Sequence, residues 1–168
     1  MNMRRWLTFV MTAVVMLATA PIEIRAETLA CPSLNTAEQV GTCPSLRELR
    51  IMFRSTCGAA GNPNAPKPGM CDSFEDFQSH KNTVMWEAGD AGFMGYLPCT
   101  LPTEKIRTAQ ATELNLASSR RITKTACDYQ GDLTLTLRRR GACALPSGAS
   151  KGRLDCAGDP AACMVECE

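Results

Sequence analysis

The chain has 168 residues, a formal net charge of +1, ten cysteines and an aromatic content of only 5%. So small a net charge gives no support to a general electrostatic attraction to nucleic acid. The length suits one domain better than two. With 12 glycines and 10 prolines beside so few aromatic side chains, a thin core and many turns are expected.

Residues 1–26 have the pattern of a secretory signal peptide. Two arginines precede an uncharged apolar stretch that ends near Ala20, shorter than the about 20 residues of a membrane-spanning helix. We predict cleavage after Ala26, because Pro21 follows the alternative site. Cleavage would remove three arginines and one glutamate and change the net charge from +1 to −1. We therefore expect a periplasmic or secreted protein that meets the membrane only through this segment.

The cysteines all follow residue 26, and an even number in an exported chain predicts a disulfide framework, because the compartment beyond the membrane is oxidising. Cys57 and Cys71 flank a segment rich in glycine, proline and asparagine and are the predicted local pair. The remaining connectivity is open. The predicted disulfide residues are Cys31, Cys43, Cys57, Cys71, Cys99, Cys127, Cys143, Cys156, Cys163 and Cys167.

Metal binding is the competing use of so many cysteines. Structural zinc favours C-x-x-C pairs, and the nearest approach here is Cys163-x-x-x-Cys167. The only histidine, His80, is distant from that segment in the sequence. We predict no metal site and no thioredoxin-like redox centre, and nothing indicates a cofactor.

Two short helices are predicted in the first half of the domain. Ser45 and Glu48 have the spacing of a capping box, and apolar residues recur at helical spacing through Phe53. Alternation over 46–55 also fits a strand, so both remain open, with a helix favoured. Residues 72–78 begin with cap-like side chains and predict a second short helix.

Strands are predicted from residue 84 onward. Val84–Glu87 and Phe93–Leu97 flank a glycine-rich segment, which indicates two strands joined by a turn. The segment 106–116 fits a strand by its threonines and a helix by its alanines.

The clearest element is a hairpin of residues 121–129 and 133–140, joined by Gln130-Gly131-Asp132. If Tyr129 pairs with Leu133, one face becomes apolar and faces the core. The residues on that face are Cys127, Tyr129, Leu133, Leu135 and Leu137.

The chain is thus expected to contain a signal peptide (1–26), a disulfide-stapled α+β domain (27–143) and an irregular, cysteine-rich acidic tail (144–168). The domain should be mostly antiparallel β with one or two short helices.

The same hairpin pairing places Lys124 opposite Arg138 on the outer face. Like charges across a strand pair are mildly destabilising, so a counter-charge is expected. One source is the acidic tail, through Asp155, Asp159, Glu166 and Glu168; the other is an acidic partner or an anionic envelope polymer. The candidate binding residues are Arg120, Arg121, Lys124, Arg138 and Arg140.

Catalytic patterns are scarce. His80 lies in a polar segment that is typical of an exposed loop, which disfavours a serine hydrolase triad. Glu87 and Asp90 beside Trp86 are the alternative, since two carboxylates near an aromatic ring can cleave a glycan. Trp86 is nevertheless expected in the core.

Cys31-Pro32, Trp86 and Cys127-x-Tyr129 before an alternating leucine strand look like small secreted bacterial proteins of a domain-of-unknown-function family. The resemblance covers roughly 31–143, and the 57–71 insertion and cysteine-rich tail depart from it. It implies an exported, mostly β domain and no activity.

These observations favour an exported, non-enzymatic module that binds another exported or envelope protein. A small envelope hydrolase acting on cell-wall glycan through a carboxylate pair is the first alternative. A structural component of a disulfide-rich coat or secretion apparatus is the second. The oligomeric state is left open.

Overall fold

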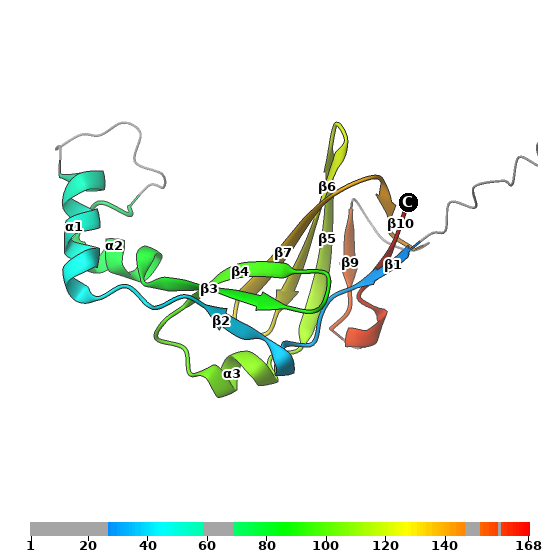
Figure 1. Ribbon diagram of the computed structural model, residues 1–168, viewed down its shortest axis with the longest axis horizontal. Helices are drawn as coiled ribbons and strands as arrows, with labels where there is room; N and C mark the ends of the chain where they lie inside the picture. Colours follow the sequence, from blue (N-terminus) through cyan, green and yellow to red (C-terminus); the bar gives the residue numbers. More distant parts are fainter. Residues whose placement is uncertain (1–26, 59–68, 147–151, 158) are drawn as a thin grey trace, which may run out of the picture.

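The computed structural model describes residues 27–58, 69–146, 152–157 and 159–168, so the predicted signal peptide lies outside the described residues. They form a disulfide-rich α+β fold, as predicted, with two antiparallel sheets and three short helices (Figure 1). The larger sheet has seven strands in the order β2-β3-β4-β7-β6-β5-β9, and the smaller has the order β1-β10-β8.

The helices are α1 (Leu46–Cys57), α2 (Phe74–Lys81) and α3 (Thr103–Thr108), with single 3-10 turns η1 (Leu34–Thr36) and η2 (Pro160–Ala162). The strands are β1 (Glu27–Ala30), β2 (Glu38–Val40), β3 (Thr83–Ala88), β4 (Phe93–Pro98), β5 (Ala111–Ser119), β6 (Ile122–Tyr129), β7 (Leu133–Arg140), β8 (Cys143–Ala144), β9 (Arg153–Asp155) and β10 (Met164–Cys167).

The predicted hairpin is confirmed as β6 and β7. Tyr129 pairs with Leu133, and Lys124 pairs with Arg138. Gly131 and Asp132 both have positive φ, at 78° and 58°, which lets the three-residue loop close between twisted strands. The strands β3 and β4 are likewise confirmed as an antiparallel pair.

The main hydrophobic core lies on one face of the seven-stranded sheet. Four of the five predicted core residues of the hairpin are buried there, and Leu137 is half-buried. The small sheet, η1 and α3 contribute Leu29, Leu34 and Ile106 to the same buried cluster. Because β5 to β7 alternate apolar and polar residues, their other face is left to solvent.

A buried phenol ties this core to the segment after β1. The Tyr129 hydroxyl donates a hydrogen bond to the Pro32 carbonyl oxygen at 2.8 Å. Burial raises the pKa of Tyr129, because the ionised phenolate would be poorly solvated there. Tyr129 is therefore a neutral hydrogen-bond donor in the folded protein.

The sheet bends sharply between β4 and β7, where the strands β2 to β4 run across Figure 1 and β5 to β7 stand upright. The register joins β4 to β7 at Met94 and Thr136. A Cβ on Gly95 would lie 2.2 Å from the Thr134 carbonyl oxygen. Glycine is needed at 95 because the two backbones approach too closely for a side chain.

Helices α1 and α2 form a separate lobe at one end of the molecule (Figure 1). The capping box is present, with Glu48 N donating to Ser45 Oγ at 3.3 Å and Ser45 N donating to Glu48 Oε2 at 2.7 Å. The Ser45 hydroxyl also donates to Glu48 Oε2 at 2.7 Å, and this bond, together with that from the Ser45 backbone N–H, lowers the pKa of the Glu48 carboxyl. Phe53 packs against Phe74 and Phe77, with ring centroids 5.7 and 5.4 Å apart.

Every cysteine is paired, in keeping with the predicted framework. The predicted local pair, Cys57 with Cys71, is confirmed and joins the end of α1 to the segment before α2. The other pairs are Cys31–Cys127, Cys43–Cys99, Cys143–Cys167 and Cys156–Cys163.

One local assignment was open in the sequence, and one expectation about local structure needs correction. The segment 106–116, left open between helix and strand, contains the end of α3 and most of β5, with the change at 109–110. The tail 144–168 was predicted to be irregular, but β9 pairs with β5 and β10 pairs with β1. These short strands lack a periodic signal, and their pairing comes from partners distant in sequence.

Candidate protein-binding face of the sheet

The face of the seven-stranded sheet opposite the core, here called the open face, carries the candidate binding residues. Side chains alternate between faces along a strand, so those beside buried positions lie on the open face. Cross-strand pairing places Lys124 and Arg138 side by side there, and Ile122 and Arg140 in the next row. All four side chains are exposed.

Arg120 and Arg121 lie at the turn between β5 and β6, at the same end of the hairpin. Arg120 has a φ of 55°, as the tight turn requires. Both side chains are exposed. We call the five candidate residues the basic end: Arg120, Arg121, Lys124, Arg138 and Arg140.

The expected neutralisation of the basic end by the tail is not seen within the described part of the chain. The ion pairs there join Arg139 to Glu27 at 3.0 Å and Arg153 to Glu113 at 2.5 Å. Neither involves a residue of the basic end or any of the four tail acids. Arg139 points to the core side, where β1 lies, and its partner comes from that strand. The basic end is left with its charges exposed.

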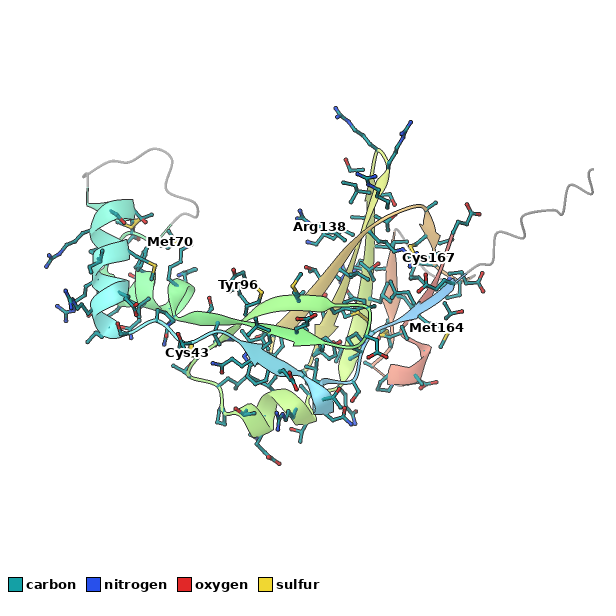
Figure 2. All side chains as sticks on the ribbon, in the orientation of Figure 1. Cys43, Met70, Tyr96, Arg138, Met164 and Cys167 are labelled. Atoms are coloured by element: carbon teal, nitrogen blue, oxygen red, sulfur yellow. A yellow bond between two sulfur atoms is a disulfide. The ribbon has the colours of Figure 1, made fainter. Side chains whose placement is uncertain are left out.

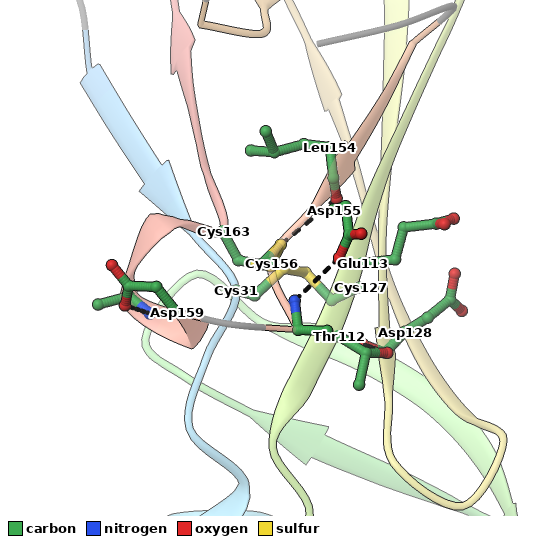
Figure 3. Close-up of a disulfide and its surroundings, with 12 residues drawn as sticks. Cys31, Thr112, Glu113, Cys127, Asp128, Leu154, Asp155, Cys156, Asp159 and Cys163 are labelled. Atoms are coloured by element: carbon green, nitrogen blue, oxygen red, sulfur yellow. Dashed lines mark hydrogen bonds between the residues drawn. A yellow bond between two sulfur atoms is a disulfide. The ribbon is translucent and has the colours of Figure 1, made fainter. Parts of the chain in front are cut away.

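The opposite end of the same face is acidic but internally satisfied. Asn115 Nδ2 donates to Glu113 Oε1 at 2.6 Å and to Asp128 Oδ2 at 2.7 Å, and Thr134 Oγ1 donates to Asp128 Oδ1 at 2.5 Å. Hydrogen bonds from Arg153 and Asn115 lower the pKa of the Glu113 carboxyl. Figure 3 shows Glu113 and Asp128 directed away from the disulfides of the core. These acids hold β9, β5, β6 and β7 together.

An exposed apolar row lies between the β2 edge and the hairpin. Val40, Met85 and Tyr96 are directly aligned across β2, β3 and β4, with Val40 and Tyr96 exposed and Met85 half-buried between them. Tyr96 is 67% exposed, and Met94 on the same strand is 47% exposed. Figure 2 shows Tyr96 and Arg138 in the angle between β4 and β7. Contiguous exposed apolar side chains of this kind commonly mark interaction surfaces.

The sequence did not indicate this row, because β4 has apolar residues at alternate positions on both of its faces. Phe93 and Leu97 are buried, yet Met94 and Tyr96 between them are exposed. Only the pairing of β4 with β3 and β7 shows which set of alternate residues faces the core.

The carboxylate site of the hydrolase alternative is not assembled. Glu87 is exposed on the open face, whereas Trp86, its neighbour along β3, is 3% exposed in the core. Adjacent strand residues face opposite sides, so this ring cannot form a sugar platform beside Glu87. Asp90 is exposed in the turn that follows.

His80 is exposed as predicted but lies in the last turn of α2 rather than in a loop. Its Nδ1 lies 2.8 Å from the Asp76 carbonyl oxygen, which can only accept, so Nδ1 carries the proton. The imidazole therefore donates a hydrogen bond to a backbone carbonyl near the end of this helix. Two hollows on the surface of α1, around Arg50 and around Met52, are lined by neither His80 nor the two carboxylates.

Within the described ranges, the side chains of His, Cys, Asp and Glu form no group of three or more placed to hold a metal ion. None of the helices in those ranges is long and apolar enough to cross a membrane. Comparison with protein-family models, curated proteins and solved structures finds no match to this chain. The resemblance to secreted proteins of unknown function stays a prediction.

Proposed function

We propose that the protein is an exported, disulfide-stabilised module of the periplasm or extracellular space that binds an acidic protein through the basic end of its open face. The observation that carries this proposal is the exposed pair Lys124 and Arg138, which lie directly opposite each other. Like charges so placed repel each other, and an acidic partner would relieve that repulsion.

Export is supported by two independent features. Residues 1–26 have the charge and apolar pattern of a signal peptide. All ten cysteines of the following segment are paired, which suits an oxidising compartment.

A protein partner is favoured over a bare anionic polymer by the apolar side chains beside the basic end. Met94 and Tyr96 offer contacts that a polyanion would not use, whereas protein interfaces commonly centre on aromatic and methionine side chains. The basic end would steer an acidic partner, and Met94 and Tyr96 would contact it.

The proposal is tested with Arg138→Glu and Arg140→Glu combined. Immobilised wild-type and variant proteins are exposed to envelope extract, and captured proteins are then purified and titrated by calorimetry at two salt concentrations. Charge reversal should weaken binding of the acidic partner by roughly tenfold or more, since opposite charges become like charges. Added salt should weaken the wild-type complex and have less effect on the variant.

The matched control is Lys105→Glu with Arg107→Glu on α3, which makes the same charge change at exposed positions on the core side of the sheet. This control should bind normally. Equal binding by the folded reversal variant and the wild type would overturn the proposal. Capture of only a glycan or other polyanion would replace the protein partner with a polymer.

A further inference from the structure

One side of helix α1, in the separate lobe, carries a row of three arginines. Arg47, Arg50 and Arg54 follow one another at spacings of three and four residues, which places them on one face of the helix. All three are exposed, and none belongs to an ion pair within the described ranges. Like charges at these spacings destabilise a helix slightly, so the row does not serve the stability of α1.

Exposed apolar side chains flank this row on both sides. At 3.6 residues per turn, Leu46 lies beside Arg50 on one side of the row, and Ile51 lies beside Arg47 on the other. Leu46 is 51% exposed and Ile51 is 55% exposed. The three arginines and these two apolar residues line one open hollow on the helix surface. The side of α1 is therefore both basic and apolar.

The position of α1 makes this side accessible to a large, flat surface. The helix forms the outer part of the lobe at one end of the molecule (Figure 1). Nitrogen-bearing side chains project from it away from the sheet (Figure 2). A flat surface can therefore approach α1 without first meeting the sheet.

The chemistry of this side suits an anionic lipid surface. The net charge after the predicted cleavage is −1, so attraction to an anionic surface has to come from a local cluster of basic side chains. Guanidinium groups donate to phosphate oxygens, and helices that lie in the membrane interface combine basic and apolar side chains in this way. Lipid headgroups can move to meet the arginines, whereas an acidic protein would have to present carboxylates at matching fixed positions.

We infer that α1 binds the surface of an anionic phospholipid bilayer. The three arginines contact lipid phosphates, and Leu46 and Ile51 reach the boundary between headgroups and acyl chains. The contact is independent of the open face, because the lobe and the basic end lie in different parts of the molecule (Figure 1). The membrane contact expected of residues 1–26 is then not the only one that this chain makes.

The test uses the exported, disulfide-bonded protein and two kinds of vesicle, one of phosphatidylcholine alone and one that also contains phosphatidylglycerol. Cosedimentation measures the partition coefficient. The wild type should bind the anionic vesicles, more weakly with added salt, and should not bind the neutral ones. Arg47→Gln with Arg54→Gln should lower the partition coefficient about 25-fold, since each basic side chain near an anionic surface contributes about fivefold. Glutamine is a good helix former, and Arg50 keeps its position over the Phe74 ring.

Two controls remove the same charge elsewhere. Lys105→Gln with Arg107→Gln changes exposed residues on α3, and Lys124→Gln with Arg138→Gln changes the basic end. Both should bind anionic vesicles as the wild type does.

The depth of the contact is tested with Ile51→Trp. Lipids brominated on their acyl chains should quench the introduced indole in the vesicle-bound protein. Trp86, which is 3% exposed in the sheet core, should not be quenched.

Absence of wild-type binding to the anionic vesicles, or equal binding by the folded α1 variant, would overturn the inference. An unquenched indole at position 51 in the bound protein would also overturn it. Loss of binding in the basic-end variant, with full binding by the α1 variant, would move the membrane contact to the open face. Capture of an acidic protein through α1 without vesicle binding would replace the bilayer with a protein.

Discussion

The seven-stranded sheet and the lobe of α1 and α2 achieve stability in different ways. The sheet buries one extended core, which the small sheet, η1 and α3 cover. The lobe buries Leu49, Met70 and Phe77 outside that cluster, beside a small aromatic group. The sheet is thus held by long-range contacts, whereas the lobe depends on a few side chains and a short disulfide loop.

The disulfides follow the same division. Cys31–Cys127 closes a loop with a sequence separation of 96 and ties the segment after β1 to β6. Cys57–Cys71 has a separation of 14 and stays within the lobe. Cys43–Cys99 lies at the boundary between the two regions, where it joins the segment before α1 to the end of β4. We therefore expect the lobe to lose its structure independently of the sheet.

The largest effect is expected for removal of the long disulfide with Cys31→Ser and Cys127→Ser. A loop of about 100 residues restricts the unfolded chain enough to contribute about 4–5 kcal/mol in the chain-entropy model. The free energy of unfolding, measured by denaturant titration with Trp86 fluorescence, should fall by about this amount. Trp86 is the only tryptophan after residue 26 and lies in the sheet core. A change within error of zero would contradict the assignment of this bridge to the sheet's stability.

Phe77→Ala should affect the lobe alone. Truncation of a buried phenylalanine commonly costs about 3–5 kcal/mol, and Phe77 is 1% exposed. Amide exchange in α1 and α2 should become much faster, while the Trp86 transition stays where it was. An equal shift in both signals would show that the lobe and the sheet unfold as one unit. Phe74→Ala, at a half-buried position, is the milder comparison.

Removal of the short bridge with Cys57→Ser and Cys71→Ser comes next. Closure of a loop of about 15 residues contributes about 3 kcal/mol. The loss should again appear as faster amide exchange in the lobe, with the sheet unchanged. In the wild type, too, amide exchange in β3 to β7 should be slower than in the lobe. Equal rates in the two regions would contradict their independent unfolding.

Tyr129→Phe tests a single hydrogen bond of the sheet. The loss leaves the Pro32 carbonyl without its donor, at a cost of about 1–2 kcal/mol. Because burial raises the pKa of Tyr129, its contribution is present below the unfolded-state pKa of about 10 and is lost as the pH rises beyond it. Wild-type stability should therefore decline in alkali, and the variant should lack that part of the decline. If the free energy of unfolding declines equally with pH in both proteins, groups other than Tyr129 cause the decline.

Elements with local sequence signals were predictable, whereas the strands of the tail were not. The hairpin has an alternating pattern and a loop that fixes its register, so Tyr129, Leu133 and their partners could be placed in advance. The capping box and the Cys57–Cys71 pair were likewise local signals. In contrast, β9 and β10 are too short for a periodic pattern and depend on β5 and β1.

The binding face was predictable only in part. The register of the hairpin was enough to place Lys124 opposite Arg138. The apolar row required the order of β2, β3 and β4, which no local pattern encodes. For the same reason, the alignment of Glu38 with Glu87 across β2 and β3 could not be recognised before the strands were placed.

The most direct test of the binding face is amine acylation of the free protein and of the washed, captured complex. Lys124 is the lysine of the basic end, whereas Lys81 on α2 and Lys105 on α3 are exposed elsewhere and act as internal references. The account predicts that Lys124 reacts much more slowly in the complex while Lys81 and Lys105 react as before. An unchanged rate at Lys124 in the complex would contradict the claim that the open face binds the partner.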